Sequence, residues 1–112
     1  MREWLFYMLR NISMRFKEGV VWMDMHPSVD SPELHKKLDL IFQKFNVAEA
    51  VITSGRDGKH KVDSFHYTGK AFDLRTNHVL QALTDAIKDE LGPHYDVLLE
   101  TDHIHVEYDP KQ

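Results

Sequence analysis

Two short segments of this chain restrict how it can fold, because both concentrate metal-binding side chains. The first contains His66 and Asp73, and the second contains His103 and His105. His66 and Asp73 are too far apart for one helical turn and have the wrong parity for one face of an unbroken strand. Gly69 lies between them and tolerates the positive φ of a bend. We therefore expect a bent first segment that is brought close to the second.

The second segment has the alternation of a strand. Its polar and apolar residues fall on opposite faces, His103, His105 and Glu107 on one and Ile104, Val106 and Tyr108 on the other. Zinc is held by imidazole nitrogen and carboxylate oxygen, and a hydrolytic site uses three protein ligands so that the fourth position carries water. His66, Asp73 and His105 supply such a set. The pattern predicts one Zn²⁺ per chain.

At these residues the sequence resembles a known family. Ser-x-His-x-x-Gly-x-Ala-x-Asp at 64–73, followed by Asp-His-x-His at 102–105, is similar to the zinc D-alanyl-D-alanine carboxypeptidases. It is also similar to the vancomycin-resistance dipeptidases and the phage L-alanyl-D-glutamate endolysins. The hedgehog signalling domain shares their fold. The resemblance covers residues 52–108, about half of the chain.

The resemblance implies an activity and a catalytic group. It implies a zinc peptidase that cleaves peptidoglycan stem peptides, at D-Ala-D-Ala or at L-Ala-D-Glu, with zinc-activated water. It also implies that Asp102, three residues before His105, is the general base. Glu100 is the alternative base, since it too lies just before the histidine pair. His103 is expected to support a metal ligand or to stabilise the oxyanion.

Three further residues are expected to meet the substrate. Ser54-Gly55-Arg56 is similar to a turn in the family whose arginine faces the substrate. Arg56 is therefore expected to hold a substrate carboxylate or the developing oxyanion through its fork of donors. Ser64 is expected to orient a group at the site by a hydrogen bond. For His60, lining of the site and simple solvation both stay open.

Two other classes of function also stay open. The hedgehog domain shows that this fold can keep zinc as a binding module, which has no need of an acid such as Asp102. A metal-free structural domain is the third possibility. The chain has eight histidines, and a lone histidine is more often solvated than a ligand. We assign that ordinary role to His26, His35, His78 and His94.

Length and charge limit the organisation and the partners. A chain of 112 residues with 42% hydrophobic residues has material for one core, so we expect one domain over 1–112, acting as a monomer. The net charge of -4 argues against a nucleic-acid partner. Lys59, Lys61 and Lys70 cluster near the predicted site and favour an anionic substrate there. The absence of cysteine excludes thiolate zinc sites and disulfides.

The N-terminal segment predicts a helix. Trp4, Leu5, Met8 and Ile12 have helical spacing, so we expect a helix over 1–16 packed on the domain, with a membrane-surface role as the alternative. The apolar run at 4–9 is too short for a signal peptide, and no run is long enough to span a bilayer. We therefore expect cytoplasmic synthesis without membrane insertion. A phage-encoded protein acting on the cell wall and a bacterial enzyme both fit.

The rest of the chain is expected to form the helices and strands that support the site. Ser31 and Pro32 start a helix that ends near Asn46, with Leu34, Leu38, Ile41 and Phe45 on its apolar side. A strand is expected at 48–53. A second helix over 77–91 has Leu80, Leu83, Ile87 and Leu91 inward and stops at Gly92-Pro93. Strands at 95–100 and 103–108 form a hairpin with its turn at Thr101-Asp102. We expect an α+β domain, a small antiparallel sheet with helices packed on one side, like the peptidase and hedgehog fold.

Overall fold

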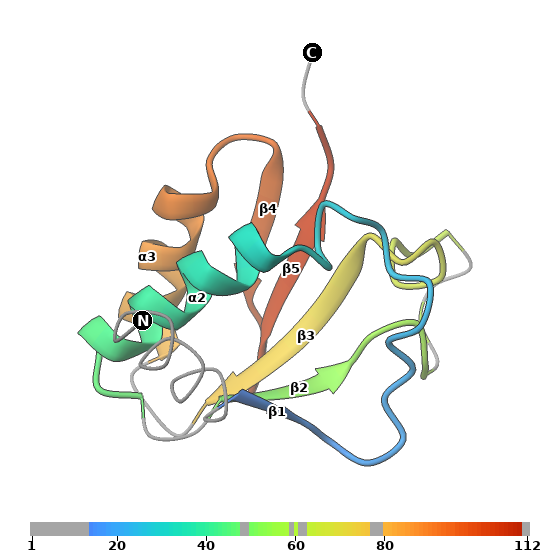
Figure 1. Ribbon diagram of the computed structural model, residues 1–112, viewed down its shortest axis with the longest axis horizontal. Coiled ribbons are helices and arrows are strands. Elements are labelled where there is room, and N and C mark those ends of the chain that lie inside the picture. The colour runs from blue at the N-terminus through green and yellow to red at the C-terminus, as the bar shows by residue number, and fades with distance from the viewer. Residues whose placement is uncertain (1–13, 48–49, 59, 61–62, 77–79, 111–112) are drawn as a thin grey trace, which may run out of the picture.

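The computed structural model describes residues 14–47, 50–58, 60, 63–76 and 80–110. Within these residues, five strands and two helices follow one another in the order β1 Met14–Phe16, α2 Pro32–Lys44, β2 Ala50–Ser54, β3 Ala71–Thr76, α3 Leu80–Leu91, β4 Tyr95–Leu99 and β5 Ile104–Tyr108 (Figure 1). The strands form a single sheet in the order β1-β2-β3-β5-β4. The expected α+β class is confirmed.

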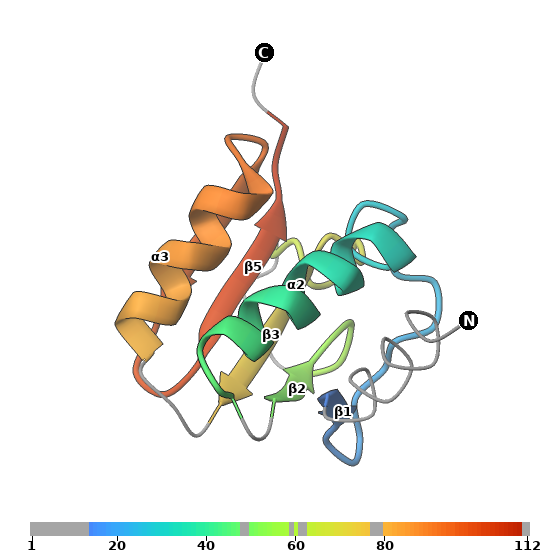
Figure 2. The ribbon, with the colours of Figure 1, turned by 60° about the vertical axis from the view of Figure 1, so that its left-hand side comes forward.

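Both helices pack against one face of the sheet, as Figures 1 and 2 show. The core between the two layers is built from alternate residues of the strands and the apolar sides of the helices, including Ile52, Phe72, Leu74, Val97, Ile104 and Val106 beneath Leu34, Leu38, Ile41, Leu83 and Ile87. Because successive side chains of a strand point to opposite faces, the intervening residues face away from the helices. That second face carries the polar residues of the predicted site.

The first strand corrects two expectations. Met14–Phe16 was expected to end a helix, but it is strand β1 and pairs in parallel with Ala50–Ile52 of β2. The sheet is therefore mixed and not purely antiparallel. A parallel pair needs a crossover connection, and the chain from β1 to β2 passes through α2. Most of the predicted helix, residues 1–13, lies outside the described residues.

The helix boundaries follow local signals. Ser31 caps α2, since its Oγ accepts a hydrogen bond from Leu34 N at 3.1 Å, with Pro32 in the first turn. The helix ends at Lys44, and Asn46 has φ 54°. The predicted second helix is confirmed over Leu80–Leu91, and its expected first turn at 77–79 lies outside the described residues, as does His78.

The strands near the site agree with the sequence pattern. The strand expected at 48–53 is Ala50–Ser54, and the predicted hairpin is β4 with β5. Its turn is closed by a hydrogen bond from Glu100 N to His103 O at 2.8 Å. None of the helices in the described part of the chain is long and apolar enough to cross a bilayer.

Candidate metal centre

The central residues of the site lie in one row that runs across neighbouring strands of the sheet. In the register of the sheet Ser54 pairs with Asp73, Asp73 with His105, and His105 with Leu98. These four side chains therefore share the face that the helices leave uncovered. A register shift between Ile52 and Ser54 is what aligns Ser54 with Asp73. Sheet pairing thus brings Asp73 and His105 together from distant parts of the sequence.

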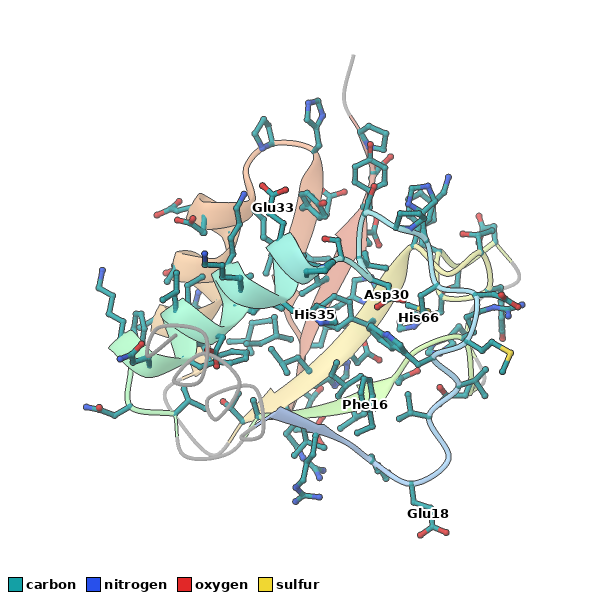
Figure 3. All side chains as sticks on the ribbon, viewed as in Figure 1. Phe16, Glu18, Asp30, Glu33, His35 and His66 are labelled. Carbon is teal, nitrogen blue, oxygen red and sulfur yellow. The ribbon has the colours of Figure 1, made fainter. Side chains whose placement is uncertain are left out.

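His66 reaches this row from the loop between β2 and β3. Its backbone N donates to Ser64 Oγ at 3.2 Å, and its Nδ1 donates to Gly55 O at 2.8 Å. Gly69 takes φ 74° and lets the loop turn back into β3, as the sequence predicted. Gly55 is needed for a different reason, because a Cβ there would lie 2.4 Å from Val21 O. Figure 3 shows His66 beside β3 on the side of these loops.

The three predicted ligands converge. His66 Nε2 lies 3.3 Å from Asp73 Oδ1, and His105 Nδ1 lies 3.0 Å from the same oxygen. The donor atoms of all three residues lie within 4.8 Å of one another. Ligand atoms at zinc bonding distance in a tetrahedral site lie about 3.4 Å apart. The spacing and the chemistry of these donors therefore fit a zinc ion, and we call the trio the central site.

Each of the two candidate histidine ligands is also hydrogen-bonded at the ring nitrogen that does not face Asp73. His105 Nε2 donates to Glu107 Oε1 at 2.7 Å, and His66 Nδ1 is held by Gly55 O. Such outer partners fix which ring nitrogen is left for a metal. Burial alone would lower the pKa of His105, but its hydrogen bonds to Asp73 and Glu107 outweigh burial and raise that pKa to about 9. In the metal-free protein His105 is therefore protonated at neutral pH.

Asp73 stays ionised in a buried position. Only 8% of its surface is exposed. Burial alone would raise the pKa of this carboxyl, but hydrogen bonds from His105 and His66 more than offset burial and hold the pKa far below its ordinary value. The site thus presents a fixed negative charge to whatever cation occupies it.

His60 lines the site. Its ring stacks on the ring of His66 with 3.8 Å between centroids and 3° between planes. Its Nε2 donates to Asp57 O at 2.9 Å. His60 therefore limits the rotation of His66. The described chain also places Tyr67 beside His60, with His60 N donating to Tyr67 Oη at 2.7 Å.

The turn between β4 and β5 carries two acids, Asp102 and Glu100, which have different neighbours. Asp102 accepts a hydrogen bond from His103 Nδ1 at 3.0 Å, and this bond lowers the pKa of the exposed carboxyl below its ordinary value. His103 Nε2 lies 3.9 Å from Asp73 Oδ2 and 3.7 Å from Glu100 Oε1. Glu100 Oε1 is also 3.9 Å from His105 Nδ1. Glu100 therefore lies nearer to the central site, and Asp102 approaches it through His103.

Arg56 is directed elsewhere. Its Nη1 donates to Met23 O at 3.3 Å and lies 3.8 Å from Asp24 Oδ2. The β2 strand ends at Ser54 and leads into the expected turn at 54–56, but the guanidinium group turns towards the 23–24 segment. The structure thus does not bring Arg56 to the three ligands. Lys59 and Lys61 lie outside the described residues.

A cavity of about 740 Å³ opens over the central site. It is lined by His60, Asp63, Ser64, Phe65, His66, Asp73, Leu98, Leu99, Glu100, His103, His105 and Glu107. Neither Asp102 nor Arg56 is among these residues. Its volume falls in the range of pockets that bind small ligands. Of the described residues that line it, none is lysine or arginine.

Sequence reasoning missed the part that Glu107 plays at this site. Glu107 was placed on the histidine face of its strand, but its contact with His105 was not foreseen. The signal was its distance of two residues from a predicted ligand, which puts both side chains on one strand face. Ser54 and Leu98 carried no such signal, because only sheet register brings them to the row. No family model and no curated protein matches this chain.

Proposed function

We propose that the protein is a zinc peptidase that hydrolyses peptidoglycan stem peptides. The observation that carries this proposal is the convergence of His66, Asp73 and His105 on one cavity, with donor spacing that suits zinc. Three protein donors leave room for the further ligand that hydrolytic chemistry needs. The motif resemblance of residues 64–73 and 102–105 supplies the substrate class.

In the proposed reaction the metal ion and the residues around its ligands have different roles. When bound, zinc supplies a water molecule of lowered pKa and polarises the scissile carbonyl. Gly55 O and Glu107 hold the outer nitrogens of His66 and His105, so both rings keep a nitrogen directed at Asp73. The stacked ring of His60 keeps His66 in place. The substrate is thereby met by a rigid set of donors.

The β4–β5 turn supplies the proton acceptor. Asp102 is our first assignment, on its three-residue offset from His105. Its carboxylate accepts a hydrogen bond from His103 Nδ1, and the His103 ring lines the cavity, so Asp102 is connected to the site of reaction through this side chain. Glu100 is the second assignment, because it lines the cavity directly.

The cavity suits a peptide that has both apolar and polar groups. Phe65, Leu98 and Leu99 add apolar surface beside the imidazoles and carboxylates. Apolar walls exclude water from the reacting bond and pack against alanine methyl groups. Ser64, whose Oγ accepts a hydrogen bond from His66 N, also lines the cavity, which supports a role for it in substrate binding.

The test is cleavage of purified muropeptides by zinc-loaded protein, read by mass spectrometry. Release of D-alanine or a split between L-alanine and D-glutamate identifies the bond. Asp102→Asn should lower turnover roughly a hundredfold or more, the usual effect of losing general-base catalysis, while zinc content stays unchanged. Glu100→Gln should lower turnover much less. The reverse order would make Glu100 the base.

A hedgehog-type binding module is the second candidate function. The observation in its favour is the position of Arg56, whose guanidinium group contacts Met23 and Asp24. A zinc-loaded wild type that cleaves no muropeptide, yet binds them in a titration, would favour this module over the peptidase.

A further inference from the structure

A third histidine is anchored in the same way as the two ligand histidines. His66 is held at one ring nitrogen by Gly55 O, His105 by Glu107, and His103 by Asp102. In each case the other ring nitrogen is directed at Asp73, at distances of 3.3 Å, 3.0 Å and 3.9 Å respectively. A carboxylate that fixes the far nitrogen of an imidazole is the usual support of a metal ligand.

The two oxygens of Asp73 face different partners. Oδ1 faces His66 and His105, whereas Oδ2 faces His103. One carboxylate can therefore bridge two positions, as it does in two-metal sites whose ions lie about 3.5–4 Å apart.

The space on the Oδ2 side is surrounded by acceptors. Asp102 can only accept, so His103 Nδ1 donates to it, and Nε2 is the ring nitrogen that lies on the side of Asp73 Oδ2 and Glu100 Oε1. At 3.9 Å and 3.7 Å these oxygens are too far for hydrogen bonds to Nε2. Two carboxylate oxygens and one ring nitrogen, which are donor types that transition metals take, therefore face one space without being hydrogen-bonded to one another.

We propose that Asp73 Oδ2, Glu100 and His103 form a second divalent-cation site that shares the Asp73 carboxylate with the central site. We call it the outer site. Its donor atoms lie within 4.8 Å of one another. Imidazole together with carboxylate oxygen suits a transition-metal ion such as zinc. Small movements of exposed side chains bring 3.7–3.9 Å to the separation of about 3.4 Å that zinc ligands have.

The charge of the cavity favours a second ion. Four carboxylates line it, those of Asp63, Asp73, Glu100 and Glu107, and none of the described lining residues is lysine or arginine. One divalent ion in the central site leaves part of this negative charge uncompensated. The outer site is the more open one, since the Glu100 and His103 side chains are 49% and 28% exposed, against 2% for His66. The second ion therefore binds more weakly than the first.

Isothermal titration of metal-free protein with zinc chloride, with bound zinc counted by elemental analysis, tests the outer site. We expect two ions per chain, the second bound at least tenfold more weakly. Glu100→Gln and His103→Ala should each abolish the weak event and leave the tight event in place. Circular dichroism checks that both variants are folded.

Asp96→Asn is the matched control. Asp96 of β4, Glu107 of β5 and Asp109, which follows β5, form another group of carboxylates whose oxygens lie within 4.8 Å of one another. The control should keep both binding events. Saturation of the wild type at one ion, or a weak event that survives in Glu100→Gln and His103→Ala but disappears in Asp96→Asn, would overturn the outer site and leave the proposed function standing. Failure to bind any zinc would overturn both.

Discussion

Asp73 is the residue on which the metal centre most depends. A buried carboxylate is costly unless it is paired, and in the metal-free protein its partners are the imidazoles of His66 and His105. Because His105 holds a proton there, a metal ion must displace that proton when it binds. In the metal-free protein the His105 ring therefore faces Asp73 as its cationic partner, and a metal ion bound by these residues would take that place.

The ligand assignment predicts a loss of zinc. Protein purified without chelator should contain one zinc in the central site, and His66→Ala or His105→Ala should lose it, because a three-ligand site cannot spare a ligand. Elemental analysis at stoichiometric zinc gives the measurement. His94→Ala, at an exposed histidine on the same chain, is the control and should keep its zinc. Full zinc content in both ligand variants would contradict the assignment.

Glu107 should set the affinity of the central site. Glu107→Gln keeps the shape of the side chain but removes the charge that faces His105 Nε2, so zinc affinity should fall roughly 10–100-fold. Competition with a chromophoric chelator measures the change. Asp96→Asn removes the acid that pairs with Glu107 across the sheet and should leave the affinity nearly unchanged. Equal loss in both variants would mean that general charge, and not the contact to His105, sets the affinity.

At the scale of elements, periodicity and capping were sufficient where the signal is local. Ser31 and Pro32 predicted the start of α2, and the alternation of 103–108 predicted which face of β5 carries His105. Strand β1 was missed because it has three residues and is defined by pairing with Ala50–Ile52, which no local pattern encodes. The bulge that aligns Ser54 with Asp73 is equally a property of the assembled sheet.

The turn after β2 is tied down by Asp57. Its Oδ1 accepts from Val21 N at 2.7 Å and from Gly55 N at 2.9 Å, which joins this turn to the segment before α2. Burial alone would raise the pKa of Asp57, but these hydrogen bonds outweigh burial and lower it. Asp57→Asn keeps an acceptor and loses the charge, so the free energy of unfolding should fall by about 1 kcal/mol at neutral pH.

Lowering the pH should remove the difference in free energy of unfolding between the wild type and Asp57→Asn. Because the folded-state pKa of Asp57 is lowered, its contribution is complete above the unfolded value of about 3.9 and disappears as pH falls through the folded value. Urea unfolding of wild type and Asp57→Asn across this range gives the measurement. Asp63→Asn, at an exposed acid of the same loop, is the control. A difference that grows in acid would contradict the role of the Asp57 hydrogen bonds.

At the scale of the whole molecule, helices on one face of the sheet leave the other face for chemistry. The convergence of the three candidate ligands was expected from the sequence, because the donor types and the motif resemblance single them out and strand alternation puts His105 on the polar face. The direction of Arg56 and the contact of Asp102 with His103 were not, because each depends on a partner that the fold supplies, such as Met23 O for Arg56. Side-chain direction is thus the part of this site that pattern alone does not determine.

A zinc ion that joins β3, β5 and the β2–β3 loop should stabilise the whole domain. At a free zinc concentration one hundred times the dissociation constant, ligand binding to the folded state adds about 2.7 kcal/mol to the free energy of unfolding. For a domain of this size that corresponds to a rise in Tm of about 10 °C. Thermal unfolding with zinc and with chelator measures the shift. His66→Ala should show almost no shift, whereas His94→Ala should match the wild type. A Tm that zinc leaves unchanged in wild type would mean that the three segments are not joined by the metal.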